Sequence, residues 1–573
     1  MEIKKQNIHM NYEKASAMSQ ITLDDDYNLP DYRPDIVKVL KEKGEIRFDE
    51  IQVKEGRIYV KGNLIFHVLY RSDMEEHKLD CLRGQIPFEE TISMDGVNEL
   101  DPVDVTAELE DINIGIINSR KLSVRALVML KAEMRMRKET ELITGVAMEH
   151  PLEILQNRHN ILELETCKKD NYRLKQEIEL PQSKPDVEQI LWKSVQLRGV
   201  ETRLREEKIQ LTGEIRLFLL YYAQKEERRL EWLEETIPLN GELACEGCSE
   251  EKIYRIQVTP ASVEVEVRPD YDGEDRKINL DMTLELDICI WKETETDVVE
   301  DVYSLREEMT PAYEEVTMSR LLAKNYAKCR LTDHMNLKKN QENILQICSC
   351  EGMAFIDHVE PQADGLKVEG SLNVEILYVT TDDAMPIGTC RETFPFEQLI
   401  EVPEMTDDMN YELEAGIEQL SAILLDNTQI EVKAVLNLNL IAFSQENIQK
   451  MDEIRITERD MEELQRQPGI TGYIVREGDS LWKIAKANHT TISQLMETND
   501  LKSEEIQKGD KLLIVKMVSW CYTKMIGNIQ KWKEQKYAQK KTYVENAVGC
   551  SRTGSNSWNF MFSKCVSKRS FKG

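Results

Sequence analysis

The sequence predicts a mainly β protein with short helices, in which three repeated β-rich domains precede a small α+β unit of βααβ order. Three observations support this class. Apolar and polar residues alternate with a period of two, as in Lys277–Leu286, which is typical of strands with one buried face. One residue pattern recurs three times along the chain, as in proteins built from internal repeats. Two short helical patterns lie between strand-like runs in residues 469–516.

The repeat is centred on a glycine that lies eight residues before a tyrosine, as Gly62 and Tyr70, Gly213 and Tyr221, and Gly370 and Tyr378. The glycines are 151 and 157 residues apart. Each tyrosine follows a leucine at the end of an alternating run, so this run is expected to be a strand. Glycine at such a place suggests a bulge or a tight entry into the strand. Further strand-like runs follow in each copy and include Leu122–Leu130, Ile278–Ile290 and Ile430–Phe443.

The first two copies also share an entry signature, with Leu29-Pro30 and Pro34-Asp35 in one and Leu180-Pro181 and Pro185-Asp186 in the other. Proline suits the first position of a short helix, because its missing N–H would be unpaired there anyway. The third copy lacks this signature around Leu337–Ile347, so its N-terminal part is expected to be degenerate. The predicted division of the chain is three β domains at 15–165, 166–325 and 326–444, a charged linker at 445–468 with a helical pattern at Glu453–Gln465, the small unit at 469–516, and a tail at 517–573.

The small unit begins with a strand-like run at Tyr473–Val475, which Gly478 and Asp479 break. Asp479 or Ser480 can cap the first helix, because a short oxygen side chain accepts a bond from a free N–H of the first turn. Thr491 can cap the second helix in the same way, and a closing strand is expected at Leu512–Val515. These residues, with Trp482 and the closing Gly509-Asp510, resemble a LysM module over the whole segment.

The LysM resemblance implies a shallow groove between two loops that binds N-acetylglucosamine-containing glycans through backbone hydrogen bonds and apolar contacts. The residues that correspond to the first loop are Gly478, Asp479, Ser480 and Leu481, and those of the second loop are Asn499, Asp500, Leu501 and Ile506. Core packing is favoured over a sugar platform for Trp482, and capping is favoured over ligand binding for Asp479.

Three β-rich copies followed by one LysM-like segment resemble the SipL family of clostridial spore-coat morphogenetic proteins, with their SPOCS-type domains and C-terminal LysM module. The resemblance covers about residues 15–516. It implies a protein made in the mother-cell cytosol that localises to the forespore surface and binds the basement-layer spore-coat ATPase. The implied function is a non-enzymatic scaffold that tethers coat layers. The alternative is a peptidoglycan-binding surface protein whose repeats act as spacers.

The net charge is −31, which argues against a nucleic-acid partner, because phosphate binding needs clustered Lys and Arg. Met1–Gln6 is polar and no long apolar run follows, so neither an export signal nor a transmembrane helix is expected. Residues 517–573 contain 11 Lys and Arg against 2 Glu, in contrast to the acidic remainder. We interpret this tail as a non-native or disordered addition, with a functional basic arm as the alternative.

The sequence gives no signature of catalysis, cofactor or metal. The 12 cysteines include one C-x-x-C pair, Cys245 and Cys248, and one C-x-C pair, Cys348 and Cys350, but neither has the second pair that a structural zinc site needs. Reduced thiols are therefore expected. The eight histidines belong to no Cys/His arrangement. A glycosidase needs only two carboxylates, so composition does not decide that case. Three copies of one domain favour a multivalent binding protein over an enzyme.

Overall fold

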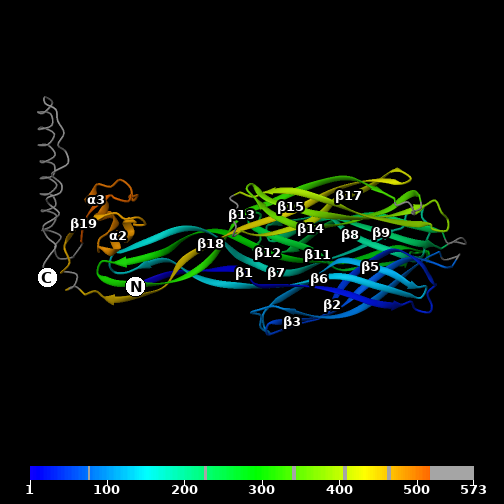
Figure 1. Cartoon of the computed structure of the whole chain (residues 1–573), viewed down its shortest axis with the longest axis horizontal. Coiled ribbons are helices and arrows are strands. Elements are labelled where there is room, and N and C mark those ends of the chain that lie inside the picture. The colour runs from blue at the N-terminus through cyan, green and yellow to red at the C-terminus, as the bar shows by residue number, and fades with distance from the viewer. Residues whose placement is uncertain are drawn as a thin grey trace, which may run out of the picture.

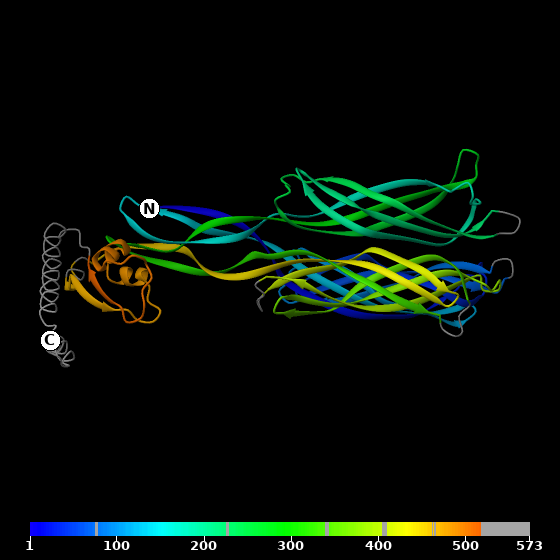
Figure 2. The same cartoon turned by 90° about the horizontal axis from the view of Figure 1, so that it is seen from above.

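The computed structural model describes residues 1–74, 78–224, 229–337, 343–403, 409–460, 462 and 466–516, without the side chains of 11–14. The described part is elongated (Figures 1 and 2). Three β domains lie side by side at one end, and the small C-terminal unit lies at the other end. The predicted tail at 517–573 falls outside the described residues.

Each β domain contains six antiparallel strands in two three-stranded sheets that pack face to face. The sheet orders are β1-β6-β5 and β2-β3-β4 in the first domain, β7-β12-β11 and β8-β9-β10 in the second, and β13-β18-β17 and β14-β15-β16 in the third. The first domain consists of β1 (Glu2–Asn28), β2 (Ile36–Lys54), β3 (Arg57–Ser72), β4 (Leu79–Ser93), β5 (Val103–Asn118) and β6 (Lys121–Ala147). The second consists of β7 (Leu152–Glu179), β8 (Val187–Arg205), β9 (Lys208–Ala223), β10 (Leu230–Ala244), β11 (Ile253–Pro269) and β12 (Asp275–Ser304). The third consists of β13 (Glu307–Asn336), β14 (Ile344–Gln362), β15 (Gly365–Thr380), β16 (Ile387–Glu401), β17 (Asn410–Asp426) and β18 (Gln429–Glu458). The predicted mainly β class with three repeated domains is confirmed.

The repeated Leu-Tyr dipeptide builds two different cores. Successive side chains of a strand point to opposite faces. Tyr70, Tyr221 and Tyr378 therefore lie inside their own sandwich, fully buried. The preceding leucines point the other way, into a core that all three domains share, and these are Leu69, Leu220 and Leu377. Burial of one such side chain stabilises the fold by about 1.5–3 kcal/mol.

The repeated glycines lie inside the central strands β3, β9 and β15, and not before them as the sequence suggested. A Cβ on Gly62 would approach the carbonyl oxygen of Arg47 to 2.6 Å, so the neighbouring backbone leaves no room for a side chain. The expected bulge exists, but it lies in the adjacent strand opposite each glycine. The register shifts there fall between Phe48 and Glu50, between Arg198 and Glu201, and between Ile356 and His358.

The proline signature forms a turn and not the short helix that the sequence suggested, because an arginine brings its carbonyl groups together. In the first domain Arg120 donates to the carbonyl oxygens of Leu29, Pro30 and Arg33 and to the Asp35 carboxylate. Arg276 makes the corresponding bonds in the second domain, to Leu180, Pro181, Lys184 and Asp186. Thr428 occupies the equivalent position in the third copy, since its carbonyl accepts from Leu337 as that of Arg120 accepts from Leu29. The third copy thus lacks both the prolines and their arginine.

Polar contacts also join the domains to one another. Lys41 of the first domain is 1% exposed and pairs with Glu351 and Glu375 of the third, at 3.1 and 2.5 Å. Arg198 of the second domain donates to the backbone of the third, at the carbonyl oxygens of Leu420 and Cys350. A buried charge left without its partner is strongly destabilising. These contacts therefore specify how the three domains associate.

The first and last strands of each domain continue past the sandwich as a two-stranded ribbon, and the three ribbons form a stalk (Figure 2). Each ribbon begins at a register shift in the same place, between Met134 and Arg135, Ile290 and Trp291, and Ala442 and Phe443. Side chains from all three ribbons share a core that includes Ile8, Leu142, Ile161, Val298, Val316 and Ile448.

The stalk changes the expected organisation of the chain. Residues 445–458 are strand, paired with β13, and neither a linker nor helical from Glu453. The predicted division points at 165/166 and 325/326 fall inside β7 and β13, and the chain passes between domains at 148–151 and 305–306 instead.

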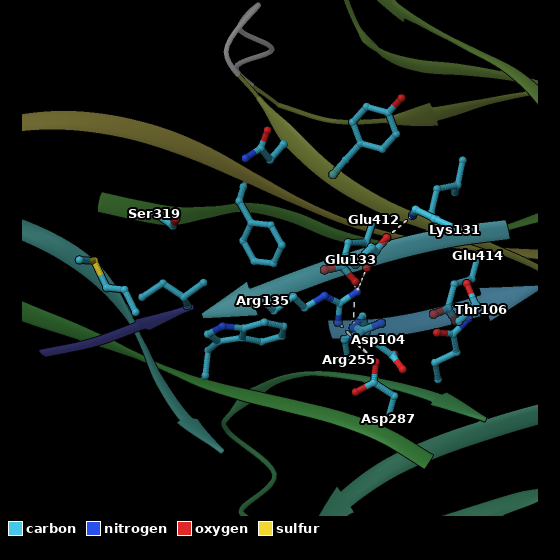
Figure 3. Close-up of a pocket in the computed structure, with 18 of the residues that line it drawn as sticks. Asp104, Thr106, Lys131, Glu133, Arg135, Arg255, Asp287, Ser319, Glu412 and Glu414 are labelled. Carbon is cyan, nitrogen blue, oxygen red and sulfur yellow. Dashed lines mark hydrogen bonds and ion pairs between the residues drawn. The ribbon is translucent and has the colours of Figure 1, made fainter. Parts of the chain in front are cut away.

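A cavity of about 1240 Å³ lies between the three domains where the stalk begins (Figure 3). Its wall contains an ion network in which Arg255 contacts Glu412 at 2.8 Å and Asp287 at 2.7 Å, while Arg135 contacts Asp287 at 3.4 Å. Glu414 also lines the cavity, and burial raises its pKa to about 7.

Candidate functional site

The C-terminal unit has the predicted βααβ order. It consists of β19 (Ile470–Ile474), α2 (Leu481–Ala487), α3 (Ile492–Asn499) and β20 (Lys511–Val515), with β19 and β20 antiparallel. Its buried core includes Val475, Leu481, Trp482, Ile484, Ala485, Leu495, Leu512 and Ile514. Ser480 and Thr491 cap the two helices by accepting from the N–H groups of Lys483 and Gln494.

The first predicted loop is organised by its own polar groups. Gly478 is exposed and has a φ of +81°, which favours glycine. Asp479 accepts from the N–H of Arg476 and from the hydroxyl of Tyr473, both at 2.8 Å, and these bonds lower its pKa. Ser480 is the helix cap and Leu481 is buried in the core. The side chains of Asp479 and Ser480 therefore stabilise the turn and the start of the helix.

The second predicted loop is fixed by Asn499. Its side-chain amide donates to the carbonyl oxygens of Leu495 and Leu513 and accepts from the N–H of Leu513, which joins α3 to β20. Asp500 ends the helix in the left-handed conformation. Leu501 and Ile506 are half-buried against the core, whereas the residues between them are exposed, namely Lys502, Ser503, Glu504 and Glu505.

The two loops belong to the same side of the unit. Lys508, two residues after Ile506, pairs with Glu477 at 2.6 Å, immediately before Gly478. Leu481, Leu501 and Ile506 pack in the same hydrophobic core. The geometry thus brings together the two loops that the LysM resemblance named.

Sequence reasoning missed the contact between this unit and the stalk. Trp482 is buried, as expected, but its indole N–H donates to Asp301 at 2.7 Å and its ring meets Tyr303 edge-on at 4.9 Å. Lys486 pairs with the same carboxylate at 2.6 Å, and the Tyr303 hydroxyl donates to the carbonyl oxygen of Thr490. Burial opposes ionisation of Asp301, but the bonds from Lys486 and Trp482 outweigh it and lower its pKa.

Arg459 makes a second set of contacts between the unit and the end of the stalk. It donates to the carbonyl oxygens of Ser304 and Glu307, at the turn between the second and third domains, and contacts His489 of the unit. Because β18 ends at Glu458, this arginine stands where the chain leaves the stalk.

The expectation of reduced thiols is wrong at Cys245 and Cys248, which form a disulfide. Both are buried and lie in the core of the second domain. The equivalent positions of the first domain hold Met94 and Val97, which are also core residues. Cys348 and Cys350 are free thiols. In the described part of the chain, no group of three His, Cys, Asp or Glu could hold a metal ion.

The fold and these loops define a protein of three β-sandwich repeats that carries a LysM-type binding module. Comparison with family models identifies the repeats. The model of the SipL SPOCS domain matches residues 35–117, 186–268 and 343–425, and the LysM model matches residues 473–515. The chain therefore has the SipL-like architecture of three SPOCS domains followed by a C-terminal LysM domain. No curated protein and no solved structure matched the chain.

The SPOCS matches cover only part of each β domain. Each SPOCS match covers the second to fifth strands of its domain, so the long strands that form the stalk lie largely outside it. The domains found support a sporulation-related protein with a module of the peptidoglycan-binding type, and both kinds of domain are non-catalytic binding types. None of the helices in the described residues has the length and apolar character that a bilayer crossing requires.

Proposed function

We propose that this protein is a non-enzymatic scaffold of spore-coat assembly, made in the mother cell, that tethers coat layers to the forespore surface. The proposal rests on the SPOCS and LysM matches together with one structural observation, the attachment of the LysM module to the end of the stalk. The three SPOCS domains and the LysM module lie at opposite ends of one elongated chain (Figure 1). Such an arrangement suits a tether, because it holds two binding surfaces apart.

In this proposal the LysM loops dock on a coat protein, and the basement-layer coat ATPase is the partner that the SipL-like architecture suggests. The residues proposed for this contact are Gly478, Asp479, Ser480 and Leu481 in the first loop, and Asn499, Asp500, Leu501 and Ile506 in the second. Three SPOCS domains supply related surfaces in one molecule, and linked weak sites gain affinity from high effective concentration.

The second candidate is direct binding of peptidoglycan through the same loops. One observation favours it. Asp479, Ser480 and Asn499 already bond to their own module, so recognition would use backbone groups and apolar contact, which suits sugar hydroxyl and N-acetyl groups.

The two candidates differ in what the full chain captures. The test presents the purified coat ATPase and purified peptidoglycan in parallel to the wild-type chain and to the double variant Glu504→Lys/Glu505→Lys. Both glutamates are exposed in the second loop, so the fold should tolerate their replacement. Glu55→Lys, in the exposed β2–β3 turn, is the control for a charge reversal outside the module.

Capture of the ATPase, lost at least ten-fold in the double variant and kept in Glu55→Lys, supports the scaffold. Sedimentation with peptidoglycan alone, with the same sensitivity, favours the second candidate. Capture of the ATPase that is unaffected by the loop variant would overturn the assignment of these loops.

A further inference from the structure

Two cysteine thiols of the second domain lie against each other. Cys167 on β7 and Cys289 on β12 are direct partners in the antiparallel register, and their sulfur atoms are 3.0 Å apart. Directly opposed residues of antiparallel strands have Cα atoms about 4.5–5.5 Å apart. Disulfides span Cα distances of about 4.4–6.8 Å. The two strands therefore already hold these cysteines at a separation that a disulfide can bridge.

The pair is not a requirement of the repeated fold. At the equivalent places the first domain pairs Ser16 with Glu133, and the third pairs Lys324 with Ile441. Neither combination could be cross-linked, and both domains form the same sheets. The two thiols are thus a property of the second domain alone, and simple core packing does not account for both of them.

The surroundings give the two sulfur atoms different characters. Cys167 is exposed, whereas Cys289 is 1% exposed. The guanidinium of Arg255 lies 3.7 Å from the Cys289 sulfur. The same guanidinium contacts Asp287 (Figure 3). The hydrogen bond with Cys289 lowers the pKa of Cys167 to about 7, and the same bond, with burial, raises that of Cys289. Thiolate character and exposure are what make a cysteine reactive.

We propose that Cys167 and Cys289 are a redox-sensitive dithiol that reacts with low-molecular-weight disulfides and closes to a cross-strand disulfide. The Cys167 thiolate attacks one sulfur of the small disulfide and releases one thiolate. The Cys289 sulfur then attacks Cys167 in the mixed disulfide, its proton passes to the second leaving thiolate, and a second small thiol is released. Two protein thiols and one small disulfide thus become one protein disulfide and two small thiols.

The two cysteines lie at the base of the ribbon that holds the LysM module, so a cross-link there affects that ribbon. Cys289 immediately precedes the register shift between Ile290 and Trp291, where the ribbon leaves the sandwich. The same ribbon ends at Asp301 and Tyr303, which hold the LysM module. Oxidation joins the two strands of this ribbon covalently at its base, and so fastens the element that positions the module.

The test uses the full chain, reduced under conditions that keep the native fold and then exposed to oxidised glutathione. Peptides from a non-reducing digest are identified by mass. The expected product is a linked pair of peptides containing Cys167 and Cys289, lighter by two hydrogens than the separate peptides. Because the same treatment also re-forms the Cys245–Cys248 disulfide, the melting temperature is compared with that of Cys167→Ser oxidised in the same way, and the wild type should melt several degrees higher. A trivalent arsenical, which needs two neighbouring thiols, should protect both cysteines from oxidation.

Two variants make the result decisive. Cys167→Ser, at the exposed position, should abolish the cross-link without unfolding the chain. Cys81→Ser removes a thiol that has no thiol partner among the described residues, and it should leave the yield unchanged. If wild-type Cys167 and Cys289 remain thiols, or each carries its own glutathione, the proposal is overturned. It is equally overturned if the arsenical protects neither cysteine.

Discussion

Replacement of Asp301 by alanine should detach the LysM module from the stalk. The carboxylate accepts from Trp482 at 2.7 Å, from Lys486 at 2.6 and 2.8 Å, and from the hydroxyl of Tyr313 at 3.0 Å. Its side chain is 15% exposed, and that of Lys486 is 32% exposed. A hydrogen bond to a charged group contributes about 1.5–3 kcal/mol, and a partly exposed ion pair contributes less. The loss should therefore be about 2–4 kcal/mol, which increases the undocked population roughly 30- to 700-fold.

Hydroxyl-radical footprinting of the full chain measures this population through the side chains of Tyr303 and Trp482, which are buried against each other across the contact. In Asp301→Ala both side chains should be oxidised faster, while the core tyrosines of the β domains, Tyr70, Tyr221 and Tyr378, should not change. Lys508→Ala is the matched control, because it removes an exposed ion pair within the module that does not touch the stalk, worth less than about 1 kcal/mol. Unchanged oxidation of Tyr303 and Trp482 in Asp301→Ala would refute the docking contact as described.

The same contact predicts a dependence on pH. The pKa of Asp301 is lowered in the folded protein relative to its ordinary value of 3.8. Its contribution to docking is therefore fully present above that value and is lost as the pH falls through the lowered pKa. Docking should be independent of pH between 5 and 8 as far as Asp301 is concerned, and should weaken below about pH 4. If docking weakens as much between pH 8 and pH 5 as it does below pH 4, Asp301 is not the responsible group.

Three further changes have clear expectations. Arg276→Ala removes the bonds that close the proline turn and should lower the free energy of unfolding by about 2–4 kcal/mol, measured by denaturant titration, whereas Thr428→Ala should change it by less than about 1 kcal/mol. Gly62→Ala should destabilise by about 2 kcal/mol or more because its Cβ meets a backbone oxygen, while Gly472→Ala, with open space around it, should be nearly neutral in the same titration. Glu414→Gln should raise the melting temperature at pH 8 but not at pH 4. Because the pKa of Glu414 is raised to about 7, its ionisation lowers the free energy of unfolding of the wild type as the pH rises through that value, by roughly 1–3 kcal/mol.

The repeated β domains could be predicted from sequence because their signals are local. Alternation along β12 and the Gly-to-Tyr spacing depend only on neighbouring residues of one strand. The stalk gave no such signal. In β18 the extra residue Asp452 shifts the phase of the strand, so that Met451 and Ile454 are buried three residues apart, a spacing that resembles a helix. Asp452 and Glu453, which lie between them, are charged and exposed, so the sequence of this stretch resembles a linker.

The LysM loops were predictable for the same reason, since their glycine, capping residues and closing turn lie within one short segment. The attachment of the module was not predictable. Trp482 and Asp301 are 181 residues apart in sequence, and only the folded ribbon brings them together. The burial of Trp482 agrees with the core role that the sequence predicts. Its indole N–H has a second role, because it bonds to Asp301 and so attaches the module to the stalk.

Three copies in one chain allow a nearly symmetric stalk to carry a single module, which three identical chains could not do. The three ribbons share a bulge at Thr144, Glu300 and Asp452, and the residue after each bulge is the equivalent of Asp301. That residue is Gly145 in the first ribbon and Glu453 in the third, and the position of Tyr303 is taken by Ala147 and Arg455. Neither ribbon offers both an aromatic ring and a carboxylate at these two positions, so the second ribbon alone can receive Trp482. A trimer of one repeat would present either three such sites or none. Divergence among the copies thus selects one attachment point, and the LysM loops take one orientation relative to three SPOCS domains.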